Sequence, residues 1–166
     1  MNDLLDVEQD TEPWRRNFIR TSVALIEGQI HCLRDICLTR LEFKGPQLAK
    51  NEIKALESEQ QFDSDERYKY VVRAAYKLFE LDPAPDFGGS EWRSAQRVFE
   101  KRHQLMHPKT PVDLEVSDEL WEEIHKGVVW LIEHVLDFPA LILEKNMADN
   151  LIEHDIDVLH LAPLPY

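Results

Sequence analysis

Residues 13–43 read PWRRNFIRTSVALIEGQIHCLRDICLTRLEF, a stretch in which apolar residues recur at steps of three and four. This spacing puts them on one face of an α-helix for about seven turns. Pro13 suits the first turn of such a helix, and Gly45-Pro46 ends it. The stretch therefore predicts one long bundle helix, whose buried stripe consists of Ile19, Val23, Ile26, Ile30, Leu33, Cys37 and Leu41.

The rest of the chain shows the same helical periodicity and little alternation. It predicts further helices over about residues 47–59, 64–81 and 90–107, with a proline- and glycine-rich loop over residues 82–89. Ser90 is expected to cap the helix that ends before Pro108, and Ser117 to cap a last, central helix with a kink or restart beyond Pro139. We therefore predict an all-α fold, an up-and-down helical bundle of four to five helices.

The composition limits the class of protein. The 166 residues suffice for one domain with a core, and 32 acidic against 19 basic residues give a net charge of −13. We expect an acidic arm over residues 1–12, the bundle over residues 13–146 and an acidic tail over residues 147–166. The acidity argues against broad contact with duplex nucleic acid or a membrane surface, so any RNA contact must be local.

Targeting and redox signals favour a cytoplasmic protein. Residues 1–10 contain four acids, which does not fit a secretory signal. The longest apolar stretch, residues 127–143, is interrupted by charged residues and a proline, so no membrane span is predicted. Cys32 and Cys37 lie on different faces of one predicted helix, which disfavours a disulfide between them. We interpret them as reduced thiols of a cytoplasmic protein.

Positive charge is concentrated in residues 93–109 of this acidic chain. From residue 88 to residue 112 there are five Lys or Arg against two Glu, and a cationic island is a candidate anion site. On a helical wheel, Arg102 falls on the apolar stripe of Trp92 and Phe99. Because a buried, unpaired guanidinium is too costly, Arg102 must be ion-paired or must face a cleft or a subunit interface.

Two histidines lie beside Arg102 in this reading. His103 and His107 are four residues apart on the adjoining face, and His107, at the helix end, can turn its imidazole back toward Arg102. An imidazole titrates near neutral pH and can move protons, whereas a planar guanidinium can clamp phosphate oxygens. The candidate catalytic residues are therefore Arg102, His103 and His107. The candidate substrate-binding residues, which would widen a phosphate track, are Arg97, Lys101 and Lys109.

Each of these assignments has a structural alternative. Arg102 could form a salt bridge with an acid of the last helix. His107 could simply favour the dipole at the end of its own helix, and His103 could be a surface residue. Lys101 and Lys109 could equally be solvated.

Two further sets of residues have open roles. Glu27, His31 and Arg34 share one face of the first helix by their spacing. They either line the same cleft as Arg102 or form an exposed polar face with local ion pairs. Aromatic side chains could stack on unpaired bases or belong to the core, and the ones concerned are Trp92, Trp121 and Trp130.

Residues 91–135 resemble the HEPN family of small α-helical bundles. The resemblance rests on the Arg-x4-His spacing of Arg102 and His107, the polar residue after Arg102, the helix end at Pro108 and the capped long helix that follows. It implies a homodimer in which two copies of the motif face each other across a cleft, and a metal-independent ribonuclease without a cofactor. Arg102 and His107 would occupy the motif positions of the family, with His103 between them.

The resemblance leaves more than one function open. Many family members are ribonucleases that act as toxins or antiviral effectors silenced by a cognate antitoxin, and others are inactive partner subunits. We therefore expect a metal-independent endoribonuclease for single-stranded or loop RNA, with an inactive HEPN-like binding or partner subunit as the alternative. A minor alternative is a di-metal carboxylate bundle, because Glu100-x-x-His103 and Glu122-x-x-His125 could supply ligands. The expected partners are RNA, a second copy of the chain and an antitoxin or other protein, but no membrane.

Overall fold

The structure is a computed structural model that describes residues 11–42, 47–58, 62–145 and 147. These residues form five α-helices and one short 3-10 helix and contain no strand. The elements are α1 (Glu12–Leu41), α2 (Lys50–Glu57), α3 (Ser64–Leu78), α4 (Ser90–Met106), η1 (Pro111–Leu114) and α5 (Asp118–Leu136). The all-α prediction is confirmed, whereas nearly all of the predicted arm and tail lies outside the described residues.

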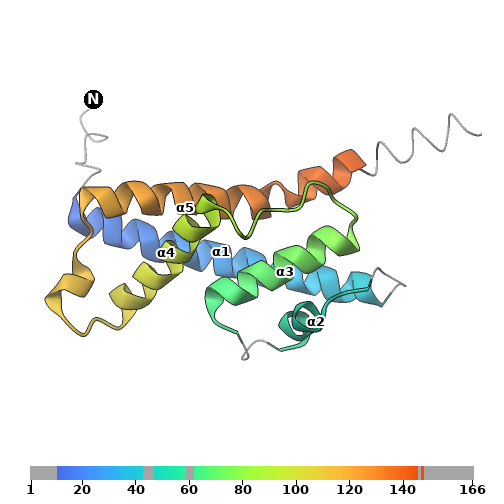
Figure 1. Ribbon diagram of the computed structural model, residues 1–166, viewed down its shortest axis with the longest axis horizontal. Helices are drawn as coiled ribbons and strands as arrows, with labels where there is room; N and C mark the ends of the chain where they lie inside the picture. Colours follow the sequence, from blue (N-terminus) through green and yellow to red (C-terminus); the bar gives the residue numbers. More distant parts are fainter. Residues whose placement is uncertain (1–10, 43–46, 59–61, 146, 148–166) are drawn as a thin grey trace, which may run out of the picture.

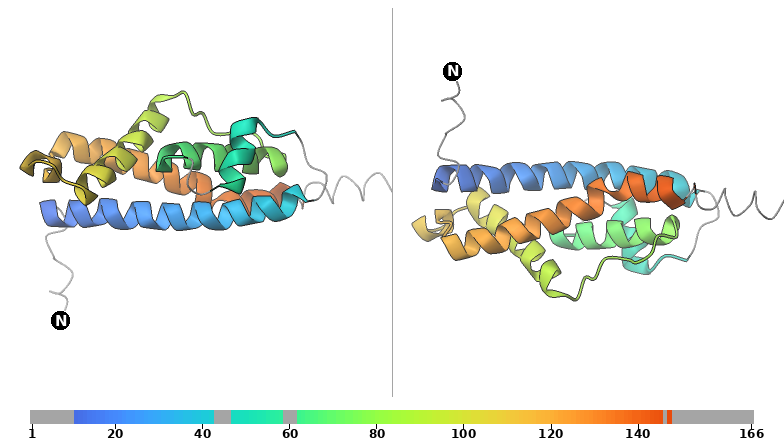
Figure 2. Two further views of the ribbon diagram at one scale, coloured as in Figure 1. Left: turned by 90° about the horizontal axis from the view of Figure 1, so that it is seen from below. Right: turned by 90° about the horizontal axis from the view of Figure 1, so that it is seen from above.

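The long helices α1 and α5 lie side by side along the long axis of the molecule (Figure 1). α3 and α4 pack against this pair, and α2 lies beside α3 (Figure 2). α5 contacts both α1 and α4, which confirms its predicted central position. Beyond a bend at Asp137, residues 138–145 are helical again, so the predicted restart near Pro139 is also confirmed. No helix in the described part of the chain is both long and apolar enough to cross a membrane.

The helix directions differ from a simple up-and-down bundle. α1 and α3 run in the same direction, because Glu27 contacts Ser64 at the start of α3 and Arg40 lies over the ring of Phe79 at its end. The up-and-down order holds from α3 through α4 to α5 (Figure 1). It fails between α1 and α3 because α2 lies between them in the chain. Helical periodicity fixes which face is buried but not the direction in which a helix packs.

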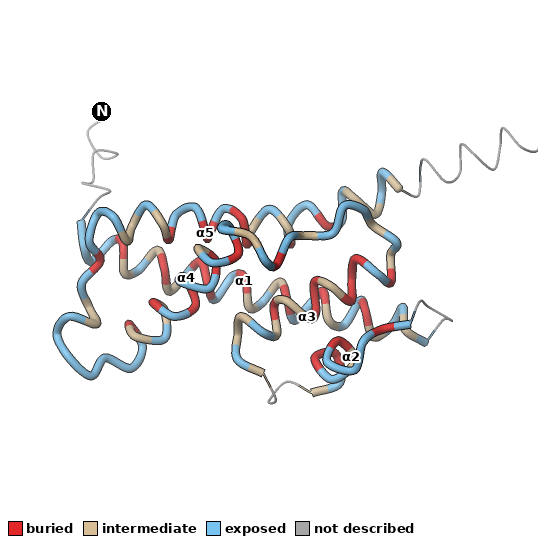
Figure 3. The backbone as a smooth tube through the Cα atoms, in the orientation of Figure 1, coloured by how far each residue is buried: buried red, intermediate tan, exposed pale blue. Residues whose placement is uncertain are grey.

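The core forms where the inward faces of the helices meet (Figure 3). The predicted stripe of α1 is buried from Ile19 to Cys37, and Leu41 is half-buried. At the centre, the ring of Tyr68 lies 6.0 Å from Trp92 and 6.2 Å from Trp130. Both tryptophans are buried and are therefore core residues rather than platforms for unpaired bases. Trp121 is half-buried and packs against rings on α1.

Two helix ends differ from the sequence prediction. α3 ends at Leu78 instead of residue 81, because Glu80 adopts a positive φ of 52° and the N–H of Leu81 donates to the carbonyl of Tyr76 at 2.9 Å. This is the Schellman arrangement that usually uses glycine, so the sequence gave no signal for it. α4 is capped by Gly89 rather than by Ser90, which is its first helical residue. The Ser117 cap is confirmed, since its hydroxyl accepts from the N–H of Leu120.

Candidate functional site

Arg102 lies on α4 and reaches toward α1. Its guanidinium is 3.3 Å from the carboxylate of Glu27, and both side chains are about one third exposed, at 32% and 34%. The other oxygen of Glu27 accepts a hydrogen bond of 2.7 Å from the hydroxyl of Ser64 at the start of α3. The salt-bridge alternative expected an acid of the last helix, but the partner is supplied by α1. Glu27 thus connects α1, α3 and α4 at one point.

His103 and His107 lie together on the exposed side of α4. Their ring centroids are 5.2 Å apart, and both residues are exposed. Within the described residues, neither imidazole has a hydrogen-bond partner, and Glu27 is the one partner of the Arg102 guanidinium. A guanidinium has five N–H donors, so Arg102 keeps donors for a ligand. His107 reaches Arg102 only by way of His103.

Arg102 and His103 share a hollow of about 620 Å³ between α3 and α4, which we call the Arg102 hollow. Three carboxylates line it beside the single guanidinium, those of Asp63, Asp65 and Glu100. Asp65 accepts a hydrogen bond of 3.0 Å from the side chain of Gln96. Carboxylates so close to Arg102 repel a phosphate, and in one copy of the chain they outnumber the positive charge.

The predicted substrate-binding residues do not extend this hollow. Lys101 is only 5% exposed, and its ammonium group donates to the carbonyl of Asp113 at 2.9 Å. Burial lowers the pKa of Lys101 below its ordinary value. Arg97 is paired with Glu100 at 2.6 Å, and together with Lys101 it lines a different hollow. Lys101 is therefore a structural tether for the segment after α4, not a phosphate ligand.

Lys109 lies beyond the end of α4 and is exposed. Its backbone N–H donates to the carboxylate of Asp113 at 2.7 Å, and that of Thr110 does the same at 2.7 Å. These two hydrogen bonds hold the pKa of Asp113 below its ordinary value. The arrangement fixes the turn that carries Lys109 and leaves its side chain toward solvent, where it can reach a phosphate.

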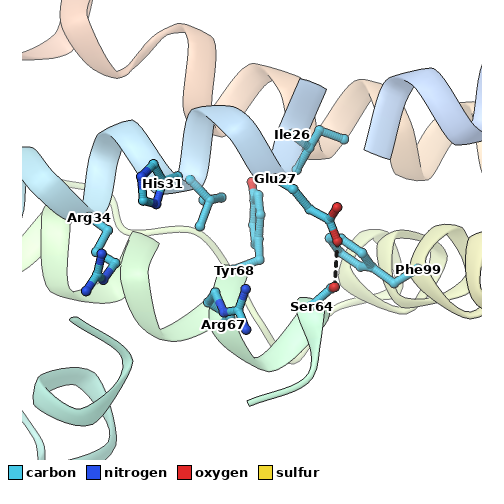
Figure 4. A pocket seen from close by; sticks show the side chains of 9 residues that line it. Ile26, Glu27, His31, Arg34, Ser64, Arg67, Tyr68 and Phe99 are labelled. Atoms are coloured by element: carbon cyan, nitrogen blue, oxygen red, sulfur yellow. Dashed lines mark hydrogen bonds between the residues drawn. The ribbon is translucent and has the colours of Figure 1, made fainter. Parts of the chain in front are cut away.

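A smaller pocket of about 100 Å³ lies on the other side of Glu27 and Ser64, between α1 and α3 (Figure 4). We call it the Arg34 pocket; its lining residues are Ile26, Glu27, Ile30, His31, Arg34, Ser64, Arg67, Tyr68 and Phe99. The prediction that Glu27, His31 and Arg34 line a common cleft is confirmed. The alternative of local ion pairs also holds, since Asp35 lies 3.8 Å from His31 and 3.4 Å from Arg34.

Sequence reasoning missed Arg67 and Ser64 as site residues. They come from α3, which no spacing in the sequence places beside Glu27. The available signal was weak: a polar first turn followed by the apolar stripe of α3, which leaves the residues beside that stripe at the edge of a helix contact.

The described residues give little support for a two-metal site. No group of three or more His, Cys, Asp or Glu among them is placed to hold a metal ion. His103 lines the Arg102 hollow, whereas the ring of His125 lies on α5 near Phe18 and Trp121. The two Glu-x-x-His motifs therefore do not converge.

The chain matches no protein-family model, no curated protein and no solved structure. The resemblance to the HEPN family stays a prediction that rests on the Arg102–His107 motif and the helices around it.

Proposed function

We propose that the protein is a metal-independent endoribonuclease of the HEPN type that acts on single-stranded or loop RNA. One observation carries the proposal. Arg102 is held by Glu27 through one contact, and two imidazoles without hydrogen-bond partners in the described chain, His103 and His107, lie on the same exposed end of α4. A guanidinium with remaining donors beside two proton-transfer groups is suited to transphosphorylation.

The reaction can be written with these groups alone. One imidazole takes the proton of the ribose 2′-hydroxyl, and the 2′-oxygen forms a bond to phosphorus. The bond from phosphorus to the 5′-oxygen breaks, and a protonated imidazole gives its proton to that oxygen. The products are a 2′,3′-cyclic phosphate and a 5′-hydroxyl. Arg102 stabilises the charge that develops on the phosphorane oxygens.

The proposal includes a homodimer. The three carboxylates of the Arg102 hollow make one copy a poor phosphate site on its own. A second copy that faces the first would add another Arg102 and another imidazole pair to the same cleft. Light scattering on the purified protein tests this point, because a monomer at working concentration would contradict a two-copy site.

The test of cleavage uses homogeneous protein and unstructured RNA in excess EDTA. We expect Arg102→Ala and His107→Ala each to lower the rate at least about a hundredfold, the range found for loss of a proton-transfer or charge-stabilising group. Arg93→Ala and His125→Ala are matched controls, because both residues are exposed and lie outside the Arg102 hollow. Equal rates for the wild type and both site variants would reveal a contaminating nuclease and reject the assignment.

The biological role within this proposal is that of a toxin or antiviral effector restrained by a cognate antitoxin. Expression of the wild-type chain should then slow growth, and Arg102→Ala should relieve the effect at equal protein level. Growth inhibition by both forms would separate the toxicity from cleavage.

A second candidate is an inactive partner-binding subunit, and the charge of the Arg102 hollow favours it. Glu27 already compensates Arg102, and Asp63, Asp65 and Glu100 make the hollow suited to a basic segment of another protein. Under this alternative the protein cleaves no RNA. It binds an Arg- and Lys-rich peptide, and the double variant Asp63→Asn, Asp65→Asn weakens that binding.

A further inference from the structure

The two hollows that adjoin Glu27 differ in charge. The Arg34 pocket has two guanidiniums and one imidazole against the single carboxylate of Glu27. The Arg102 hollow has one guanidinium and one imidazole against three carboxylates. In a chain with a net charge of −13, the Arg34 pocket is thus a place where cationic groups outnumber acids. An anion is attracted to the Arg34 pocket rather than to its neighbour.

The shape of the pocket fits a small ligand with one charged end. Its floor is apolar, since Ile26, Ile30, Tyr68 and Phe99 are all buried. Figure 4 shows the polar groups at two sides of this floor, with the arginines on one side and the hydrogen-bonded Glu27–Ser64 pair on the other. An apolar surface with a few convergent polar groups is typical of small-molecule and cofactor sites.

Neighbouring backbone groups orient the two guanidiniums. Nε of Arg34 donates to the carbonyl of Leu56 at 2.6 Å, and Nη2 of Arg67 donates to the carbonyl of Phe62 at 3.2 Å. A carbonyl fixes the direction of a guanidinium but carries no net charge, so these contacts preserve the positive charge of the pocket. Asp35, which is largely exposed, lies 3.4 Å from Arg34. Planar guanidiniums held in this way are suited to phosphate oxygens.

We propose that the Arg34 pocket binds the phosphate of a nucleotide, with Arg34 and Arg67 on the phosphate and the base over the apolar floor. The choice of a nucleotide rests on the proposed ribonuclease function. The pocket would then hold the nucleotide next to the one cleaved, because Glu27 contacts Arg102 and also lines the pocket. The seven residues from Glu27 to Arg34 correspond to a rise of about 10 Å along α1, which separates the two phosphate positions.

The test is a calorimetric titration of the full chain, independent of cleavage. The probes are uridine 5′-monophosphate, inorganic phosphate, uridine and a short single-stranded RNA with 2′-O-methyl groups that cannot be cleaved. We expect the monophosphate to bind and uridine not to bind. Arg67→Gln should weaken binding about tenfold or more, whereas Arg93→Gln, an exposed arginine of α4, should leave it unchanged.

Several outcomes would overturn the proposal. Equal affinity of Arg67→Gln and wild type, or binding of uridine as tight as that of the monophosphate, contradicts a phosphate site in the pocket. Circular dichroism checks the fold of the variants. If Arg67→Gln unfolds, the exposed His31→Gln decides by the same criterion.

The probes also distinguish the source of the phosphate and the fate of the two proposals. Tighter binding of the RNA than of the monophosphate identifies a strand as the ligand, and equal binding identifies the free nucleotide. Nucleotide binding that persists in Arg102→Ala, without RNA cleavage by the wild type, supports the pocket and rejects the ribonuclease. Cleavage by a protein that binds no monophosphate and is unaffected by Arg67→Gln supports the ribonuclease and rejects the pocket.

Discussion

The carboxylate of Glu27 lies 3.3 Å from the guanidinium of Arg102, although 75 residues separate the two in the chain. Both side chains are about one third exposed, at 34% and 32%. An ion pair in such surroundings contributes about 0–1 kcal/mol because water screens it. The contact therefore matters more for the direction of the Arg102 side chain than for the stability of the fold.

Glu27→Gln tests this positioning role. We expect the free energy of unfolding to change by less than about 1 kcal/mol. In RNA cleavage, KM should fall because a repelling carboxylate is gone, and kcat should fall because Arg102 is less well oriented. Glu12→Gln is the matched control, since Glu12 lies 3.3 Å from Arg16 in an exposed pair of α1. An unchanged kcat with an unchanged KM would show that Glu27 has no part in the site.

Gly127→Ala tests the close contact between α4 and α5. A Cβ at Gly127 would overlap the backbone carbonyl of Ser94 and lie 2.8 Å from the backbone nitrogen of Ala95. We expect a loss of about 2 kcal/mol in the free energy of unfolding, because backbone atoms cannot move aside as a flexible side chain can. The higher helix propensity of alanine, about 1 kcal/mol, does not compensate.

Gly28→Ala is the control for that variant. Gly28 is exposed within α1, and no atom lies within 4 Å of an added Cβ. We expect a gain of about 0.5–1 kcal/mol from helix propensity and a more restricted unfolded chain. Chemical denaturation of both variants measures the difference, and a stabilising Gly127→Ala would show that the helices are not in close contact there.

Lys101 should leave a signature in the pH dependence of stability. Burial lowers its pKa from the ordinary value of 10.5, although Asp113 opposes the shift. The unfolded chain then binds more protons than the folded protein between the lowered pKa and about pH 10.5, so stability rises with pH in that window. Below the window, the unfavourable burial of the charge is fully present.

Lys101→Met removes this group from the titration. The difference in unfolding free energy between wild type and variant should change across the same alkaline window, which urea denaturation at a series of pH values measures. The difference also cancels the effect of Tyr68 and Tyr76, whose pKa values are raised by burial. A constant difference would contradict the buried ammonium group. RNA affinity should not change, because Lys101 is tied to the carbonyl of Asp113.

The two thiols should differ in reactivity. Cys32 is exposed, whereas Cys37 is buried on the core stripe of α1, where burial raises its pKa to about 12. A thiolate is the reactive form, so a water-soluble disulfide reagent near pH 8 should modify Cys32 alone in the native protein. Both thiols should react after denaturation, and Cys32→Ser should abolish the native reaction. Rapid modification of Cys37 would mean that α1 opens locally.

Local sequence accounted for most of the secondary structure. The stripe from Ile19 to Cys37, the Ser117 cap and the loop over residues 82–89 all depend on neighbouring residues, whose spacing can be read directly. The end of α3 was missed because Glu80 takes a conformation that normally requires glycine.

The candidate site was predictable only in part. The sequence placed Arg102, His103 and His107 on one helix end, and it placed Glu27, His31 and Arg34 on one face of another helix. It could not show that Lys101 is buried against the carbonyl of Asp113, because η1 folds back onto α4 only in the complete fold.

By itself the sequence determined the helices and their buried faces, since a period of 3.6 residues is a property of the backbone and of near neighbours. Tertiary structure decided which charges meet. The parallel packing of α1 and α3 brings Ser64 and Arg67 to the face that carries Glu27 and Arg34, and the opposite direction of α4 brings Arg102 to Glu27. Contacts between distant segments depend on how whole helix faces pack together, and no local pattern of residues specifies that choice.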